Sequence, residues 1–134
     1  MKLIIAGGRD FSDYNLLKTE VMKFILENNG VPGNIEIISG KAKGADSLGE
    51  RFSKEWNFPV IEMPADWDNL DCPQVWIKYN NQGKPYNSAA GTIRNEEMAK
   101  IATHCICFFN GSKGTANMIE NAKKHNLVHK IVNY

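Results

Sequence analysis

The stretch KLIIAGGRD, residues Lys2–Asp10, decides the fold that the sequence predicts. A short apolar run of this kind is typical of a buried strand, and its two glycines end it in a tight turn. Ser12 and Asp13 then offer an N-cap to a helix. Apolar side chains recur on one face of that helix, at Tyr14, Leu17, Val21, Phe24 and Ile25. The chain therefore opens with a strand, a glycine turn and a helix.

The same alternation continues to the end of the chain. Further strands are expected at Ile35–Ile38, Phe58–Met63, His104–Phe109 and Val128–Val132. Further helices are expected from about Gly44 to Trp56, from Thr92 to Ala102, and after Gly114 to about His125. Because right-handed crossovers between parallel strands place helices on both faces of a sheet, this order indicates the α/β class. We predict a single Rossmann-like, three-layer αβα domain over residues 1–134, with a mostly parallel sheet of about five strands.

The segment Pro64–Ala90 has no sustained period and is expected to be a long loop. Its aromatic residues lie among Asp, Asn, Gln, Gly and Pro. Loops of this length in a compact domain are commonly functional. The aromatic side chains could equally fasten the loop to the body of the domain.

Composition and charge exclude several classes of protein. The chain has 134 residues, 43% of them hydrophobic and 23% charged, which excludes a mostly disordered chain. Sixteen Lys and Arg against 15 Asp and Glu give a formal net charge of +1, so a nucleic-acid polymer is not the expected partner. The apolar run Leu3–Ala6 is too short for a signal peptide or a membrane span, which predicts a cytoplasmic protein without membrane contact.

The three cysteines have no Cys-x-x-Cys spacing, so neither a disulfide framework nor a metal site is expected. Cys105 and Cys107 should lie on the same side of one strand as small buried side chains. A zinc site that adds His104 is the weaker alternative.

Three predicted strands end in loops that contain glycine: Gly7–Asp10, Ser39–Asp46 and Asn110–Thr115. In parallel sheets, ligands bind beyond the carboxyl ends of the strands. Glycine lets a ligand approach the backbone, and the following helix N-terminus favours an anion. None of these loops is a Walker A sequence or a dinucleotide fingerprint, which disfavours an ordinary ATPase or an NAD enzyme. The loops predict a small phosphate-bearing ligand and no required cofactor.

Arg94 and Asn95 are expected in the first turn of the helix that follows the long loop. The planar fork of an arginine suits phosphate or carboxylate, and this one would lie near the pocket.

Five motifs in order resemble the YspA-type, YpsA-related branch of the SLOG superfamily. They are Gly-Gly-Arg-Asp-Phe (Gly7–Phe11), Ser-Gly-x-Ala-x-Gly-Ala-Asp (Ser39–Asp46), Pro-Ala-Asp-Trp (Pro64–Trp67), Arg-Asn-x-x-Met (Arg94–Met98) and Gly-Ser-x-Gly-Thr (Gly111–Thr115). The superfamily is Rossmann-like and includes DprA and the LOG phosphoribohydrolases. The resemblance implies a pocket for a nucleotide or a nucleotide-derived ligand. It also implies a homo-oligomer, with a dimer expected.

One position departs from the pattern of the LOG enzymes. Those enzymes carry a Glu after the glycine loop, where this chain has Met118. Glu120 lies roughly 200° further around the helix and cannot replace it. Glycosidic cleavage needs a carboxylate, so a LOG-like phosphoribohydrolase is disfavoured. Catalysis stays open, with Arg94, Asp46 and Asp66 as the candidate catalytic residues and Asp10 and Glu97 as further carboxylates.

Three functions follow from these observations. The first is a protein that binds, and so senses or sequesters, a small nucleotide-derived, phosphate-bearing ligand. The second is a hydrolase or transferase that acts on a nucleotide N-glycosidic or phosphate bond. The third, DprA-like binding of single-stranded DNA, is the weakest because the chain has no basic stripe.

The residues expected to hold the ligand are Gly7, Gly8, Arg9, Asp10, Ser39, Gly40, Lys43, Gly44, Ala45, Asp46, Asp66, Trp67, Arg94, Asn95, Asn110, Gly111, Ser112, Gly114 and Thr115. Several have a purely structural alternative. Asp46 could cap its helix, Asp10 could pair with Arg9, and Thr115 is expected as the N-cap of the last helix. Trp67 could stack on a base or fill the core.

Overall fold

The computed structural model describes residues 1–73 and 75–134, and its elements alternate as the sequence predicts. The strands are β1 (Lys2–Gly7), β2 (Glu36–Ser39), β3 (Val60–Glu62), β4 (Ile77–Tyr79), β5 (Pro85–Asn87), β6 (His104–Phe109) and β7 (Val128–Asn133). The helices are α1 (Tyr14–Glu27), α2 (Ala45–Glu55), α3 (Ala90–Ile101) and α4 (Lys113–Lys124), with a short 3-10 turn at Pro32–Asn34. Asp13 caps α1 as expected, because its side chain accepts a hydrogen bond from the amide of Leu16 at 3.1 Å.

Five strands form one sheet in the order β3-β2-β1-β6-β7, and every pair in it is parallel. The chain builds outward from β1 to β3, then returns to the other side of β1 with β6 and β7. Strand order therefore reverses between β1 and β6, where Leu3 pairs with His104 and Gly7 with Phe108. In open α/β sheets, the crevice at this reversal is where ligands bind.

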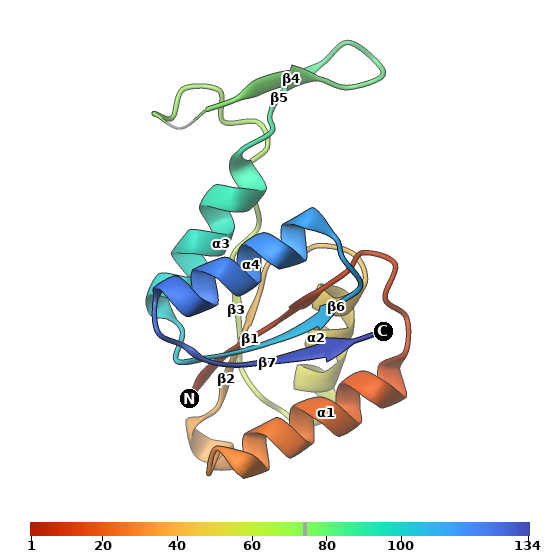
Figure 1. Cartoon of the computed structure of the whole chain (residues 1–134), viewed down its shortest axis with the longest axis vertical. Coiled ribbons are helices and arrows are strands. Elements are labelled where there is room, and N and C mark those ends of the chain that lie inside the picture. The colour runs from red at the N-terminus through yellow and green to blue at the C-terminus, as the bar shows by residue number, and fades with distance from the viewer. Residues whose placement is uncertain (74) are drawn as a thin grey trace.

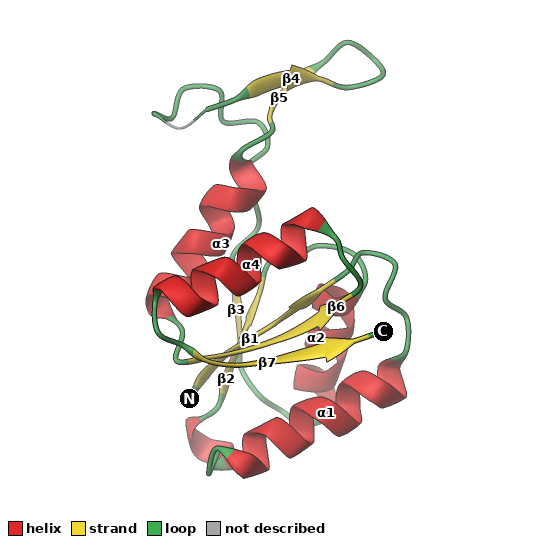
Figure 2. Ribbon diagram, in the orientation of Figure 1, coloured by secondary structure: helices red, strands yellow, loops and turns green. Residues whose placement is uncertain are grey.

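The sheet has two buried faces, each covered by a pair of helices (Figure 2). On β1, Leu3 and Ile5 pack into the cluster that contains the apolar side chains of α1 and α2. Ile4 and Ala6 point the other way, into the cluster formed with α3 and α4. This alternation follows from the period of two in a strand. The predicted three-layer α/β arrangement is confirmed, and its sheet is wholly parallel.

The segment expected to be one long loop contains a small antiparallel hairpin, made of β4 and β5, which projects from the body (Figure 1). The strand side chains of β4 are all exposed, so no alternating apolar pattern marks it. The hairpin is held at its base by Asn87, which is 1% exposed and accepts from the amides of Trp76 (3.1 Å) and Ala89 (3.0 Å). Gln74, within the same segment, lies outside the described residues.

Cys105 and Cys107 are buried on the same side of β6, as expected, with their Sγ atoms 3.5 Å apart. Within residues 1–73 and 75–134, no group of three or more His, Cys, Asp or Glu side chains is placed to hold a metal ion. In the same part of the chain, no helix combines the length and the apolar character that crossing a membrane requires.

Candidate functional site

A cavity of about 590 Å³ opens at the carboxyl ends of β1 and β6, at the reversal of strand order. Its walls come from the loops after β1 and β2, the start of α2, Trp67, Ser88, helix α3, and the loop and helix after β6. Its volume lies within the range of about 300–1,000 Å³ that small-molecule sites occupy.

The structure brings together many of the residues that the sequence singled out. Those that line the cavity are Gly7, Arg9, Asp10, Asp46, Trp67, Arg94, Asn95, Asn110, Ser112, Gly114 and Thr115. Those that lie outside its lining are Gly8, Ser39, Gly40, Lys43, Gly44, Ala45, Asp66, Glu97 and Gly111. Asp66 thus does not line the cavity, whereas the other candidate catalytic residues, Asp46 and Arg94, do.

Other lining residues were not among those expected to hold the ligand, although Ala42 and Lys113 lie in the predicted loops: Ala6, Ala42, Ser88, Gly91, Thr92, Met98, Lys113, Asn117 and Met118. Met98 and Met118 are buried and read as ordinary core positions of their helices. Asn117 follows no glycine and carries no charge, so no local signal marks it.

The glycines of the loop after β2 serve close packing of the protein on itself. A Cβ on Gly40 would overlap the guanidinium of Arg94 and lie 2.8 Å from Oδ2 of Asp46. Gly44 has a φ of +77°, and a Cβ there would meet the backbone carbonyl of Gly8. That same carbonyl accepts from the amide of Ala45 at 3.3 Å, so the first amide of α2 already has a partner. This loop is closed against the chain and supports the site from behind.

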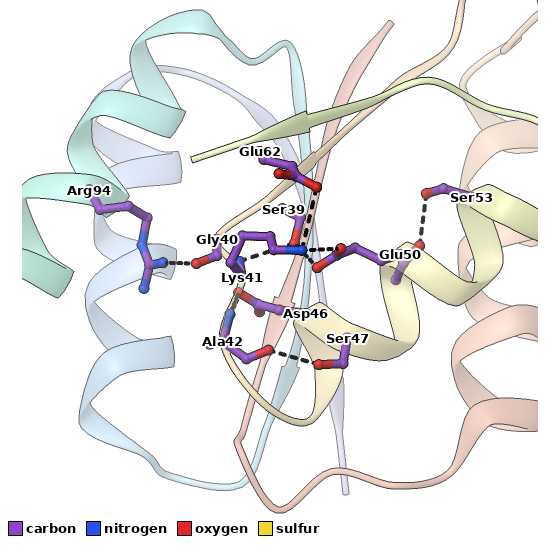
Figure 3. A network of polar contacts seen from close by, with 11 residues as sticks. Ser39, Gly40, Lys41, Ala42, Asp46, Ser47, Glu50, Ser53, Glu62 and Arg94 are labelled. Atoms are coloured by element: carbon purple, nitrogen blue, oxygen red, sulfur yellow. Dashed lines mark hydrogen bonds and ion pairs between the residues drawn. The ribbon is translucent and has the colours of Figure 1, made fainter. Parts of the chain in front are cut away.

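Arg94 is anchored at one side of the cavity (Figure 3). Its Nη1 donates to the carbonyl of Gly40, and its Nε donates to Oδ1 of Asn95 at 3.0 Å. Burial lowers its pKa; the charge of Asp46 partly offsets this, while Arg9 lowers the pKa further. An arginine stays charged in this setting. Because α3 begins at Ala90, Arg94 lies in the second turn of the helix. The prediction that Arg94 lies in the first turn is therefore wrong.

Trp67 packs against the first turn of α3. Gly91 is in the first turn, where the ring of Trp67 packs against it and a Cβ would lie 3.2 Å from that ring. Trp67 also contacts Tyr86 edge-on at 6.4 Å between ring centroids. Its side chain is 37% exposed, so Trp67 is fastened on one side and still borders the cavity.

Asp46 is only 6% exposed, and its carboxylate closes the loop that precedes it. Gly44 is the N-cap of α2, so Asp46 does not occupy the capping position. Instead its Oδ2 accepts from the amide of Ala42 at 3.3 Å. Burial raises its pKa, and the amides of Ala42 and Gly40 with the charge of Arg94 oppose that rise. Asp46 is therefore a buried carboxylate that borders the cavity and is short of compensating partners.

Among the described residues, two side chains donate to the carboxylate of Asp10, and Arg9 is not one of them. Its Oδ1 accepts from the hydroxyl of Tyr134 at 2.6 Å, and its Oδ2 accepts from Nδ2 of Asn110 at 3.0 Å. The Tyr134 hydroxyl is the main reason that the pKa of Asp10 is lowered. Tyr134 is distant in sequence and carries no motif, so the sequence analysis missed it.

The loop after β6 leaves open space beside its two glycines. Gly111 has a φ of +98°, and a Cβ on Gly111 or Gly114 would meet no atom within 4 Å. The first helical bond of α4 runs from the amide of Ala116 to the carbonyl of Ser112 at 3.0 Å. The amides before Ala116 therefore lack an intrahelical partner, as in every α-helix. The start of α4 presents donors to the cavity.

Ser112, and not Thr115, is the N-cap residue of α4. Thr115 is buried within the first turn, and its Oγ1 accepts from the hydroxyl of Ser112 at 2.8 Å. The expected cap at Thr115 is thus wrong by one turn, because the helix begins as soon as Gly111 has turned the chain.

Lys41 points away from the cavity. Its Nζ pairs with Glu50 at 2.8 Å and with Glu62 at 3.4 Å, beside the buried hydroxyl of Ser39 (Figure 3). Of the basic residues in these loops, the ones that line the cavity are Arg9, Arg94 and Lys113.

Comparisons with known proteins agree with this fold. A family model described as "YAcAr: YspA, cpYpsA-related SLOG family" matches residues 1–69, just over half of the chain. The structure is similar to the X-ray structure of DNA processing protein A (DprA) from Streptococcus pneumoniae, with a TM-score of 0.64 and 17% sequence identity. That match covers 97% of this chain and 49% of the DprA chain, so this chain spans about half of its length. No curated protein sequence matches the chain.

Proposed function

Because the chain belongs to the YspA, cpYpsA-related SLOG family, we propose that it binds a small nucleotide-derived, phosphate-bearing ligand in the cavity at the carboxyl ends of β1 and β6. The observation that carries this proposal is that Arg9, Arg94 and the open start of α4 face one cavity. Binding without turnover would make the protein a sensor or a store for such a ligand.

The phosphate end of the ligand lies at the start of α4. Unpaired amides and the helix dipole favour an anion there, and Gly114 leaves the backbone open to close approach. Arg9 and Arg94 are close enough for Arg9 to lower the pKa of Arg94. An anion placed between two like charges relieves their repulsion, which adds to its affinity.

The sugar and base lie further from α4. Asp10 is held ionised by its partners and can accept from sugar hydroxyls through its remaining lone pairs. Trp67 offers a partly exposed ring at the rim, where a base can stack. Met98 and Met118 supply an apolar floor.

A small molecule fits this cavity better than a polymer. The cavity contains both cations and carboxylates, whereas proteins that bind nucleic-acid polymers present a continuous basic surface. The resemblance to DprA concerns the fold and carries no argument for DNA as the ligand.

The binding experiment uses AMP, ADP-ribose and NAD as probes, with thermal shift and calorimetry as the readouts. Mass spectrometry of the purified protein identifies any ligand carried with it. Arg94→Ala should weaken binding of a phosphate-bearing probe by at least about tenfold, since a charge-assisted contact is worth about 1.5–3 kcal/mol. The control is Lys54→Ala at the far end of α2, which should bind as the unmodified protein does. No binding of any probe, and no carried ligand, would refute the proposal.

A second candidate function, a hydrolase or transferase, is favoured by one observation. Asp46 borders the cavity and its pKa is raised by burial, as in carboxylates that act as general acids or bases. A LOG-like reaction is disfavoured because Met118, which is buried at 1% exposure, occupies the position where those enzymes carry a Glu. Chromatography of released base or phosphate separates the two functions. Turnover that Asp46→Asn abolishes, with binding retained, would establish the enzyme.

A further inference from the structure

Three asparagine side chains form a hydrogen-bonded group where α3 meets α4, at the side of the cavity that Arg94 borders. Nδ2 of Asn95 donates to Oδ1 of Asn117 at 3.0 Å and to the carbonyl of Gly114 at 3.3 Å. Nδ2 of Asn121 donates to Oδ1 of Asn117 at 3.3 Å and to its backbone carbonyl at 3.0 Å. Asn95 and Asn121 are 6% and 7% exposed. Buried amides of this kind need their partners, which makes the arrangement directional.

The direction is set by Arg94, whose guanidinium can only donate. Because its Nε donates to Asn95, the carbonyl oxygen of Asn95 faces Arg94 and its NH₂ group faces Asn117. The carbonyl oxygen of Asn117 must then face Asn95. Its NH₂ group is left on the other side.

The NH₂ group of Asn117 has no hydrogen-bond partner among residues 1–73 and 75–134, whereas its oxygen has two. Asn117 lines the cavity. In the described part of the chain, Nδ2 of Asn117 is not a fully buried atom, so it remains accessible to a ligand. Arg94 and the NH₂ group of Asn117 are thus both donors, and the bond from Arg94 to Asn95 sets the orientation of the Asn117 amide.

We propose that Asn117 is a specificity-determining residue that donates a hydrogen bond from Nδ2 to a phosphate oxygen of the ligand, with Asn95 as its positioning residue. This inference rests on the proposed function. It adds a contact that selects a ligand with a hydrogen-bond acceptor at this position. Together with Arg94 and the amides at the start of α4, Asn117 makes this side of the cavity a surface of donors. The carboxylates that line the same cavity, Asp10 and Asp46, come from the loop after β1 and from the first turn of α2.

The decisive substitution is Asn117→Asp. Aspartate has the same shape and still accepts from Asn95 and Asn121, so the contact between the helices is retained. It presents an oxygen and a negative charge where the NH₂ group was. Affinity for AMP and inorganic pyrophosphate should fall by at least about tenfold, while affinity for adenosine, which lacks phosphate, should stay within about twofold.

Two further variants separate specificity from fold and from charge. Asn57→Asp adds the same charge at an exposed position beyond the far end of α2 and should change neither affinity. Asn95→Asp leaves Asn117 intact but offers it an oxygen, so the Asn117 amide turns its own oxygen toward the cavity. That variant should also weaken AMP binding, and combining it with Asn117→Asp should add less than the sum of the two losses.

A spectroscopic readout covers the case of a variant that fails to fold. In the unmodified protein, the side-chain NH₂ resonances of Asn117 should shift on titration with pyrophosphate and not with adenosine. If the unmodified protein binds none of the phosphate-bearing probes and carries no ligand through purification, the proposed function fails and this inference fails with it. If it binds them while Asn117→Asp binds equally well, or the Asn117 resonances do not move, only the inference is overturned.

Discussion

The hydroxyl of Tyr134 donates a hydrogen bond of 2.6 Å to Oδ1 of Asp10, across 124 positions of the chain. The ring of Tyr134 also contacts Phe11 edge-on at 4.8 Å between centroids. A Cβ on Gly8 would overlap the Tyr134 hydroxyl, so Gly8 makes room for this contact. The end of β7 thereby holds the loop after β1, which forms one wall of the cavity.

Removing this hydroxyl should loosen the wall. Tyr134→Phe keeps the ring packing but leaves Asp10 without its main partner, so the pKa of Asp10 should rise. Carboxyl titration by NMR measures that rise directly. Affinity for a ligand that Asp10 contacts should fall by roughly two- to tenfold, the worth of one ordinary hydrogen bond.

The stability effect of Tyr134→Phe should depend on pH. The hydroxyl lowers the folded-state pKa of Asp10 from its usual 3.8, so it stabilises the fold while that carboxylate is ionised. The variant should be the less stable protein above the unfolded-state pKa. The difference should disappear as the pH falls through the folded-state pKa of Asp10. Urea unfolding at neutral and at acid pH checks this, and a difference that is equal at both would contradict it.

Gly114→Ala should separate stability from binding. A Cβ there meets no protein atom, and alanine is the better helix former, so the free energy of unfolding should rise by up to about 0.5–1 kcal/mol. The same methyl group would occupy the approach to the start of α4. Affinity for AMP should therefore fall, by about tenfold for a loss of 1.4 kcal/mol. If the variant binds AMP normally, the phosphate does not bind at this helix end.

Gly40→Ala should act in the opposite way, through the fold. Its Cβ would force Arg94 and Asp46 apart, which should lower the free energy of unfolding by about 1–3 kcal/mol. Gly33→Ala is the matched control, since its Cβ meets nothing within 4 Å and its effect should stay within about 0.5 kcal/mol. Denaturant unfolding of both variants measures the contrast. Equal effects would show that the close contact at Gly40 carries no energy.

Asp46→Asn should stabilise the protein at neutral pH. Burial raises the pKa of Asp46, so its ionised form disfavours folding at pH values above that pKa. Asparagine retains an oxygen to accept from Ala42 without the charge. The gain should be largest at neutral pH and should vanish as the pH falls to the unfolded-state pKa. A variant that is less stable at neutral pH would show that the charge is well compensated in the fold.

The sequence predicted the fold well because its evidence is local. Within one strand, alternate side chains face opposite helix layers: Leu3 and Ile5 face one layer, and Ile4 and Ala6 face the other. That pattern is visible in the sequence of the strand. The loops that border the cavity follow from where strands end. The hairpin of β4 and β5 escaped because its exposed side chains have no core to face.

Within the site, the sequence predicted the loops better than the individual contacts. Gly40 and Gly114 look alike as loop glycines, yet one is filled by Arg94 and the other is open. Tyr134 reaches Asp10, and Asn117 reaches Asn95, only because distant segments meet in the fold. Residue type and spacing do not indicate contacts between distant segments, so these contacts could be identified only from the structure.

The reversal of strand order also bears on how the protein is made. β1 is synthesised first, but Leu3 pairs with His104, so one edge of β1 stays open until most of the chain exists. The crevice cannot form before β6 inserts beside it. Any ligand held there binds only the completed sheet, and by mass action it stabilises that state against every intermediate that lacks β6. Occupancy of the crevice would thus favour the chain in which β6 has completed the sheet.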